Sequence, residues 1–230
     1  MTPSRVPTPE LHARVTSALG KEPVDWRRPD TGLSAAQRFV VRFADGSKVF
    51  VKAAVDPQTE RWLRTEREIL SSFDRSFVPK LVAWIEEGER SVLVTEDLSA
   101  AYLPADRMPV AWQAGQLDRL FETLRCVGEV AAPPSLPSVE QGFEPQWPHI
   151  AQEADDFLKL GLCSEDWFRA ALGALSEAES RVPLRGDALV HGDVRSDNLC
   201  FLGERLVLVD WAAAARGNRE HDLATASPAS

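Results

Sequence analysis

Residues 190–211 read VHGDVRSDNLCFLGERLVLVDW and gather oxygen-bearing side chains around two short apolar stretches. Asp193 and Asp197 flank a predicted turn, and Asp210 ends a predicted apolar strand, which presents its carboxylate at the rim of a lobe. Together with the amide of Asn198, these are the oxygen donors that Mg²⁺ takes alongside substrate phosphates. A zinc site is not indicated, because the four histidines of the chain are scattered.

Far upstream, one lysine stands in the middle of a predicted strand. The turn Asp45-Gly46 predicts a β-hairpin, and residues 48–54, KVFVKAA, predict its second strand. Because side chains alternate between the two faces of a strand, Phe50 and Lys52 share a face. A lysine in this position either protects a sheet edge or points into a cleft.

The remaining pattern predicts an α+β chain with two unlike parts. Before residue 98 it predicts helices over 9–19 and 56–73 and strands over 38–43, 48–54, 81–86 and 91–96. A connection follows over 98–108. Later residues predict helices over 111–130, 149–160 and 164–181, a proline-rich loop over 131–148, and strands over 199–202 and 206–209. A small antiparallel sheet interrupted by one helix therefore precedes a mainly helical part.

Taken in chain order, these residues resemble the aminoglycoside phosphotransferase family, the small-molecule branch of the protein-kinase-like fold. The resemblance covers roughly residues 24–222, and it is specific because its motifs agree in order, spacing and predicted element. It implies a two-lobed α+β fold, with a nucleotide-binding lobe over 1–97 and a mainly helical lobe over 109–230. The matching residues are Lys52, Glu66, Thr95-Glu96-Asp97-Leu98, His191-Gly192-Asp193, Asn198 and Asp210-Trp211.

The resemblance implies roles for residues near the carboxyl end of the chain. Asp193 would accept the proton of the acceptor hydroxyl, or orient that hydroxyl, as it attacks the γ-phosphate. Asn198 and Asp210 would hold Mg²⁺ against the nucleotide phosphates. Arg195 would stabilise the transferred charge, or would pair with a neighbouring carboxylate on the surface. His191 is expected to brace the catalytic loop through a backbone hydrogen bond.

In the first lobe, the resemblance implies that Lys52 pairs with the α- and β-phosphates of ATP or GTP and that Glu66 is its ion-pair partner. Glu68 lies two residues further on, about 200° around the helix, so only one of the two glutamates can face the sheet. The sequence Glu-Arg-Glu-Ile-Leu fits the family's helix in the register that selects Glu66.

Two further nucleotide contacts are implied less directly. Ser34 stands in the loop TGLSAAQ, which has one glycine and not a glycine-rich run, and both Ser34 and the backbone amides there would contact phosphate. Glu96 and Leu98, at the junction of the lobes, would meet the base through backbone groups, so their side-chain identity says little.

Charge narrows the set of partners. The formal net charge is −9, which disfavours nucleic acid or an anionic membrane, because both require a positive surface. Residues 1–99 carry 15 basic and 15 acidic side chains, whereas residues 100–230 carry 11 and 20. An acidic second lobe favours a cationic acceptor such as an aminoglycoside, although acidic surfaces also serve solubility alone. Choline, homoserine, a sugar and a macrolide are the open alternatives.

The chain carries no signal for export or membrane insertion. Its first residues lack the apolar core of a secretory signal, and no stretch approaches the roughly 18 apolar residues that a spanning helix needs. Cys126, Cys163 and Cys200 are widely spaced and odd in number, which indicates free thiols in a reducing compartment. A cytoplasmic protein is expected.

Three other functions compete. Only 20 residues follow Asp210, whereas the family usually adds helices that complete the second lobe, so a nucleotide-binding protein without turnover is the first alternative. A protein kinase is disfavoured, because 20 residues cannot hold an activation segment and a peptide-docking lobe. A metal hydrolase that uses Asp193, Asp197 and Asp210 would leave Lys52 without a role.

Overall fold

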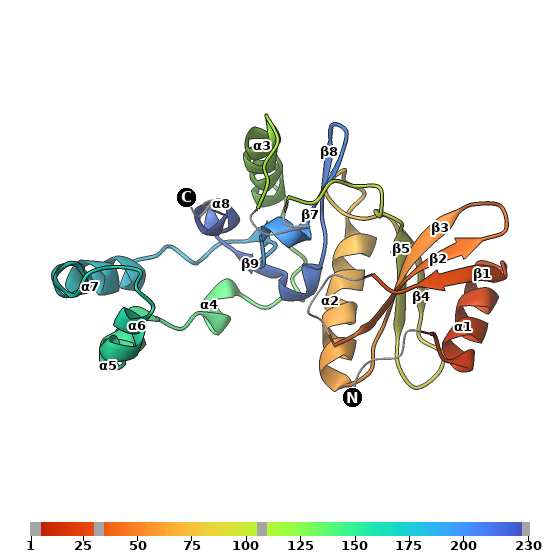
Figure 1. Cartoon of the computed structure of the whole chain (residues 1–230), viewed down its shortest axis with the longest axis horizontal. Helices are drawn as coiled ribbons and strands as arrows, with labels where there is room; N and C mark the ends of the chain where they lie inside the picture. Colours follow the sequence, from red (N-terminus) through yellow and green to blue (C-terminus); the bar gives the residue numbers. More distant parts are fainter. Residues whose placement is uncertain (1–5, 30–34, 105–109, 227–230) are drawn as a thin grey trace.

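The computed structural model describes residues 6–29, 35–104 and 110–226 of the chain. Alternating apolar and polar residues in the first hundred positions form a five-stranded antiparallel sheet in the order β1-β2-β3-β5-β4 (Figure 1). The strands are β1 (Pro23–Arg27), β2 (Gln37–Phe43), β3 (Lys48–Ala53), β4 (Leu81–Ile85) and β5 (Val92–Glu96). The four strands expected from the alternation are confirmed.

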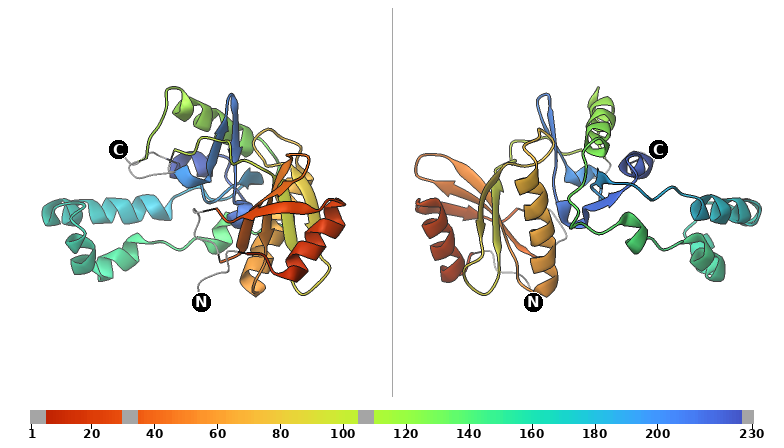
Figure 2. Two further views of the ribbon diagram at one scale, coloured as in Figure 1. Left: turned by 45° about the vertical axis from the view of Figure 1, so that its right-hand side comes forward. Right: turned by 180° about the vertical axis from the view of Figure 1, so that it is seen from behind.

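Helix α1 (Pro9–Leu19) covers one face of this sheet, and α2 (Pro57–Ser72) lies on the other (Figures 1 and 2). α1 begins where the Thr8 hydroxyl accepts the Leu11 N–H at 3.2 Å, and it ends at Gly20 in the left-handed conformation. The buried side chains of Leu11 and Val15 pack on the outward face of the sheet. Both ends agree with the helix predicted from the sequence.

α2 belongs to a second, larger core that joins the sheet to the rest of the molecule. Asp56 caps it, accepting the Thr59 N–H at 2.7 Å. Its apolar residues pack with side chains from the second half of the chain, chiefly Leu63, Ile69 and Leu70 of α2 with Leu120, Leu124, Leu189, Leu208 and Trp211. The position of α2 is therefore fixed from both sides.

The second half of the chain is mainly helical, with two small sheets. Its helices are α3 (Gln116–Gly128), α4 (Val139–Gly142), α5 (Trp147–Gln152), α6 (Ala154–Lys159), α7 (Glu165–Ser180) and α8 (His221–Thr225), with the 3-10 turns η1 (Ser196–Asn198) and η2 (Trp211–Ala213). β6 (Ala188–Val190) pairs with β9 (Ala215–Gly217), and β7 (Leu199–Leu202) pairs with β8 (Arg205–Leu208). The β7–β8 hairpin was expected, whereas the three-residue strands β6 and β9 were not.

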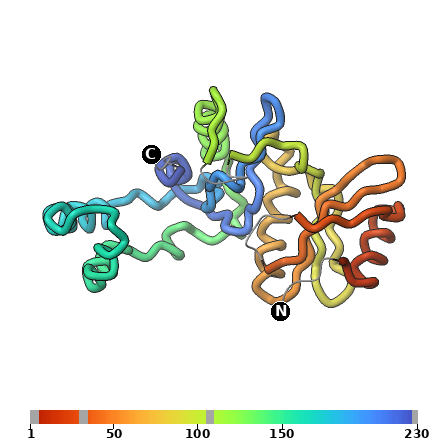
Figure 3. Tube along the Cα trace, viewed as in Figure 1, coloured from red at the N-terminus to blue at the C-terminus, as the bar shows by residue number. Residues whose placement is uncertain are grey.

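α5, α6 and α7 form an arm that projects from the body of the molecule (Figure 3). Two extended segments connect this arm to the rest, and all three views show it standing apart. Its aromatic side chains pack on each other: the rings of Trp147 and Phe157 lie 6.1 Å apart, and those of Phe157 and Phe168 lie 5.3 Å apart, centre to centre. The arm thus has a small apolar cluster of its own.

The helix predicted over residues 111–130 is shorter in the structure. α3 begins after Gly115, whose φ of 77° lies in the left-handed region and cannot continue a right-handed helix upstream. Leu120, Leu124 and Val127 are buried as expected. In the described part of the chain, no helix is both long enough and apolar enough to cross a membrane.

Leu124→Ala should lower the free energy of unfolding by about 2–5 kcal/mol, because it leaves a cavity in the core shared by α2 and α3. Urea denaturation followed by circular dichroism measures this change. Arg125→Ala, at the next and exposed position of the same helix, should stay within about 0.5 kcal/mol of the wild type. Equal losses in the two variants would show that α3 does not pack as described.

Candidate active site

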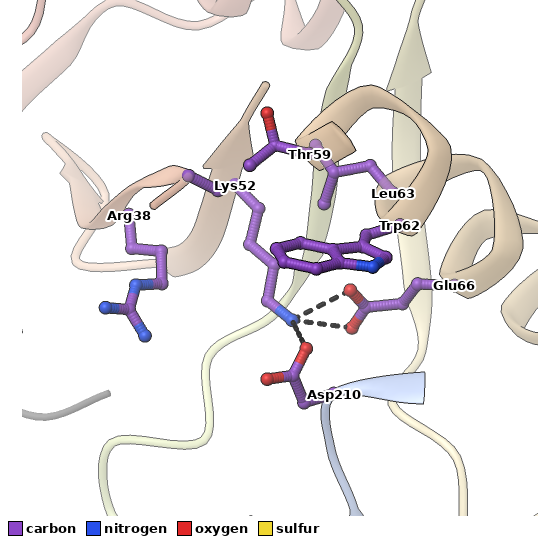
Figure 4. Close-up of a pocket in the computed structure, with 8 residues that line it drawn as sticks. Arg38, Lys52, Thr59, Trp62, Leu63, Glu66 and Asp210 are labelled. Atoms are coloured by element: carbon purple, nitrogen blue, oxygen red, sulfur yellow. Dashed lines mark hydrogen bonds and ion pairs between the residues drawn. The ribbon is translucent and has the colours of Figure 1, made fainter. Parts of the chain in front are cut away.

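The structure brings Lys52, Glu66 and Asp210 together between the sheet and the second half of the chain (Figure 4). The Lys52 ammonium lies 2.8 Å from each carboxylate oxygen of Glu66 and 3.4 Å from Oδ1 of Asp210. Lys52 and Glu66 are nearly buried, with 14% and 3% of their side chains exposed, whereas 38% of the Asp210 side chain is exposed. One ammonium therefore links β3, α2 and the residue that precedes η2.

Burial would lower the pKa of Lys52, but the carboxylates of Glu66 and Asp210 outweigh it, and this pKa lies above its ordinary value. Burial is also the main reason that the pKa of Glu66 is raised, an effect that the nearby Lys52 charge opposes. Lys52 consequently stays cationic at neutral pH. A dehydrated, permanently charged ammonium beside an accessible carboxylate suits an anionic ligand that arrives with a metal cation.

Asp210 has an unusual backbone. Its φ of 66° and ψ of 58° place it in the left-handed region, and it is the single non-glycine residue with positive φ in the described ranges. Aspartate tolerates this region better than most residues, but the conformation still costs energy. The turn aims the Asp210 carboxylate at Lys52, because η2 starts immediately after it and Trp211 is anchored in the core.

The loop around Asp193 is held by a buried carboxylate. Asp222, in α8, accepts the backbone N–H of His191 at 2.6 Å and that of Gly192 at 3.0 Å. The buried His191 ring bonds through Nε2 to the Val209 carbonyl at 3.1 Å, and its Nδ1 accepts the Asp193 N–H at 3.2 Å. Burial lowers the pKa of His191, so the ring stays neutral. These bonds agree with the bracing role expected of His191.

Gly192 is required by a close approach. Its φ is 77°, and a Cβ atom there would lie 2.6 Å from the Ala213 carbonyl oxygen. The His191 ring packs on Trp211 with ring centres 4.4 Å apart. The loop before Asp193 is thereby pressed against the turn that follows Asp210, so the two acidic residues are positioned by the same small set of contacts.

Asp193 and Asn198 are joined directly. The Asn198 amide nitrogen donates to the Asp193 backbone oxygen at 2.9 Å and to its carboxylate Oδ2 at 3.0 Å. Arg195 lies 3.9 Å from the Asp193 carboxylate but forms two shorter bonds with Asp197, at 2.5 and 3.0 Å. Of the two roles open to Arg195, the structure therefore contains the surface pairing. With its nitrogen engaged, Asn198 has its side-chain oxygen available as a ligand.

This donor set fits Mg²⁺. In the described residues, no three histidine, cysteine, aspartate or glutamate side chains gather as a metal cluster. One carboxylate, Asp210, and one amide oxygen, Asn198, are what a magnesium ion takes when phosphate oxygens and water complete its shell. The protein supplies too few ligands to hold such an ion tightly without phosphate.

Of the other predicted nucleotide contacts, Glu96 and Leu98 do not line the pocket beside Lys52, and Ser34 lies outside the described residues. The Glu96 carboxylate receives two bonds from Arg205, at 2.7 and 3.0 Å, and the Lys80 N–H at 2.8 Å, so its side chain ties β5 to β8. Leu98 is half-buried, and its carbonyl accepts the Ala101 N–H at 2.9 Å.

Sequence reasoning did not single out Asp222 or Arg205 as parts of the site. Arg205 also donates to the carbonyls of Ser76 and Val78, at 2.8 and 2.9 Å, so it clamps the segment before β4 as well as Glu96. Both residues act across more than 25 positions of sequence, and no local pattern marks them. The signal available for Asp222 was that the resemblance to the family extends as far as this residue.

A pocket opens beside the Lys52 ion pair (Figure 4). It is lined by residues of β2, β3, α2 and the turn at η2, together with one residue just before β2: Ala36, Arg38, Lys52, Thr59, Trp62, Leu63, Glu66 and Asp210. Charged groups of both signs face this pocket, and Trp62 lines it as an apolar wall.

The comparisons with known proteins agree with this arrangement. The profile of the phosphotransferase enzyme family matches residues 25–229, so the chain belongs to that family. The resemblance to aminoglycoside phosphotransferases and the kinase-like α+β fold are thereby confirmed. A comparison with curated protein sequences gives no match.

Solved structures share the fold at low sequence identity. An aminoglycoside-3'-phosphotransferase of type VIII is 24% identical, with a TM-score of 0.54 over 87% of this chain and 75% of that one. A macrolide 2'-phosphotransferase type I is 15% identical, with a TM-score of 0.56, and the match covers 98% of this chain and 80% of that one. The apoenzyme of macrolide 2'-phosphotransferase MphH from Brachybacterium faecium is 16% identical, with a TM-score of 0.57, and the match covers 94% of this chain and 75% of that one.

The thiols offer a test of how closed the site region is. Burial raises the pKa of Cys200 on β7 to about 12, against the opposing charge of Lys52, whereas Cys126 is exposed. Because the thiolate is the reactive form, Ellman's reagent at about pH 8 should modify Cys126 in the folded protein and Cys200 only after unfolding. Cys163 is half-buried, so the variants are compared in a Cys163→Ser background. There, Cys126→Ser should remove the fast phase, and Cys200→Ser should leave it unchanged. A fast-reacting Cys200 would contradict the packing of β7.

Proposed function

We propose that this protein transfers the γ-phosphoryl group of ATP or GTP to a hydroxyl group of a small molecule. The observation that carries the proposal is the convergence of Lys52 with Asp210, because a buried ammonium and a metal-capable carboxylate meet beside a pocket. Membership of the phosphotransferase enzyme family supports the reaction class. Because ATP and GTP are abundant in the cytoplasm, we expect the protein to act there.

In the proposed reaction, the Asp193 carboxylate accepts the proton of the acceptor hydroxyl, or orients that hydroxyl. A bond forms between the acceptor oxygen and the γ-phosphorus, and the bond from that phosphorus to the β–γ bridging oxygen breaks. The nucleoside diphosphate leaves with the electron pair. The hydrogen bond from the Asn198 side-chain nitrogen to Oδ2 fixes the orientation of the Asp193 carboxylate. Such a reaction needs this positioning.

Lys52 would bind the α- and β-phosphates, with Glu66 holding the ammonium in place. Asn198 and Asp210 would hold Mg²⁺, which neutralises phosphate charge when it is bound. Phe50, half-buried on the Lys52 face of β3, offers an aromatic surface to the base. The base edge would meet backbone groups between Glu96 and Leu98. Arg195 would stabilise transferred charge only after leaving Asp197, with which it pairs in this structure.

The acceptor is proposed from charge. The acidic excess lies entirely in residues 100–230, which favours a small cation with hydroxyl groups, such as an aminoglycoside. The similar solved structures include both an aminoglycoside and a macrolide phosphotransferase, so a macrolide is the principal alternative. Neither nucleic acid nor a membrane is a proposed partner.

Asp193→Asn should abolish transfer while nucleotide affinity stays within about three-fold, because the variant removes the proton acceptor and keeps the shape of the side chain. A panel of aminoglycosides, macrolides, choline and sugars is incubated with Mg²⁺-ATP or Mg²⁺-GTP. Mass spectrometry detects the gain of about 80 Da that one phosphoryl group adds. Calorimetry measures nucleotide binding in parallel.

Asp187→Asn serves as the matched control, since this carboxylate lies nearby in the chain and is 93% exposed. It should transfer phosphate like the wild type. Full activity of Asp193→Asn would refute the role of Asp193. A wild type that binds nucleotide and phosphorylates no compound of the panel would favour the alternative of a nucleotide-binding protein without turnover.

Asp222→Asn should slow transfer about ten-fold or more with a small change in nucleotide affinity, because the loop before Asp193 loses a charged acceptor for two backbone N–H groups. The measurement compares kcat with the nucleotide dissociation constant, and a melting curve checks that the variant is folded. If kcat stays unchanged in a folded variant, Asp222 does not position the loop.

A further inference from the structure

Arg38 on β2 faces the candidate site and has no role in the proposed reaction so far. The β2–β3 register pairs Arg38 directly with Lys52, so both side chains lie on the same face of the sheet. Arg38 also lines the pocket that Lys52, Glu66 and Asp210 line. In Figure 4 its guanidinium lies on the side of Lys52 away from Glu66.

Positive charge accumulates at this end of the pocket. Arg38 is half-buried, and burial lowers its pKa, an effect that the Asp210 charge opposes and the Arg28 charge reinforces. Arg38 and Lys52 thus place two like charges on neighbouring strands beside the same pocket, and these charges repel one another. An anion with several charges would relieve the repulsion.

The strand order indicates which part of the anion Arg38 meets. β5, which leads to the proposed base contacts, neighbours β3, and β3 neighbours β2. With strands about 4.8 Å apart, Lys52 lies one strand from β5 and Arg38 lies two. A nucleotide that extends from the end of β5 across the face of the sheet therefore passes Lys52 first and reaches Arg38 with its last phosphate.

The sequence before β2 also favours a phosphate contact by the Arg38 side chain. The segment TGLSAAQ, residues 31–37, has one glycine and not a glycine-rich run. Arg38 is the next residue along the chain. Its planar, forked guanidinium can donate two parallel hydrogen bonds to phosphate oxygens, which a lysine cannot do.

We propose that Arg38 binds the terminal phosphate of the nucleoside triphosphate and makes the site prefer a triphosphate over a diphosphate. This inference rests on the proposed function and assigns a specificity residue to the same site. Because Arg38 is at the start of β2 and not in the loop around Asp193, its contribution to nucleotide binding is separable from proton transfer.

Calorimetry in the presence of Mg²⁺ tests the proposal with two probes, a non-hydrolysable ATP analogue and ADP, and is repeated with the guanine counterparts of both. Arg38→Ala should weaken binding of the analogue about 10- to 100-fold, the range expected for the loss of a charge-assisted contact, and binding of ADP less than about three-fold. Arg38→Lys should give an intermediate loss for the analogue, since it keeps the charge and loses the fork.

Arg42→Ala is the matched control, because Arg42 lies on the same strand and the same face, four residues on, and is exposed. It removes the same charge and should change neither affinity. Circular dichroism melting curves verify folding, and if Arg38→Ala is unfolded, Arg38→Gln takes its place, since glutamine keeps part of the apolar stem.

The outcomes are distinct. A wild type that binds neither probe in its adenine or its guanine form would refute the proposed function, and the role of Arg38 with it. A wild type that binds both probes, with Arg38→Ala equal to Arg42→Ala, would refute the role of Arg38 alone. An equal loss for the analogue and ADP would also overturn it, because the contact would then not involve the terminal phosphate.

Discussion

The buried ion pair between Lys52 and Glu66 is the interaction on which the rest of the structure depends. A buried charge that loses its partner is strongly destabilising, so β3 and α2 must keep their relative position for either residue to stay where it is. Asp210 shares the same ammonium from the other half of the molecule. The Lys52 ammonium therefore fixes the distances between β3, α2 and the turn at Asp210. These distances determine the shape of the pocket beside it.

Apolar packing also fixes the relative positions of α2 and Asp210. The larger core contains residues of α2 together with residues of α3, β7, β8 and η2, so α2 does not belong to the sheet alone. Trp211, wholly buried, follows Asp210 directly and packs on His191. The apolar contacts that stabilise the fold thus also fix the positions of Asp210 and the loop before Asp193. A change that weakens this core should therefore also disturb the candidate site.

Local signals in the sequence were sufficient for much of this. Alternation placed Phe50 and Lys52 on one face, and the helical pattern located α1 and α2. The choice of Glu66 over Glu68 agrees with the structure, where Glu66 is buried, whereas Glu68 is half-buried and bonds to Ser135. Arg205 could not be predicted, because its partners lie more than 100 residues away and arise from folding. The strands β6 and β9 have three residues each, too few for a period to register.

The arm formed by α5, α6 and α7 has a consequence for how the protein loses its structure. Its aromatic cluster is internal to the arm, and two extended segments are its links to the body. Such a unit can open locally while the larger core stays intact, so its amide hydrogens should exchange with solvent before those of β3 or α2. Proteases should cleave within the two linking segments first and leave the body as the resistant fragment.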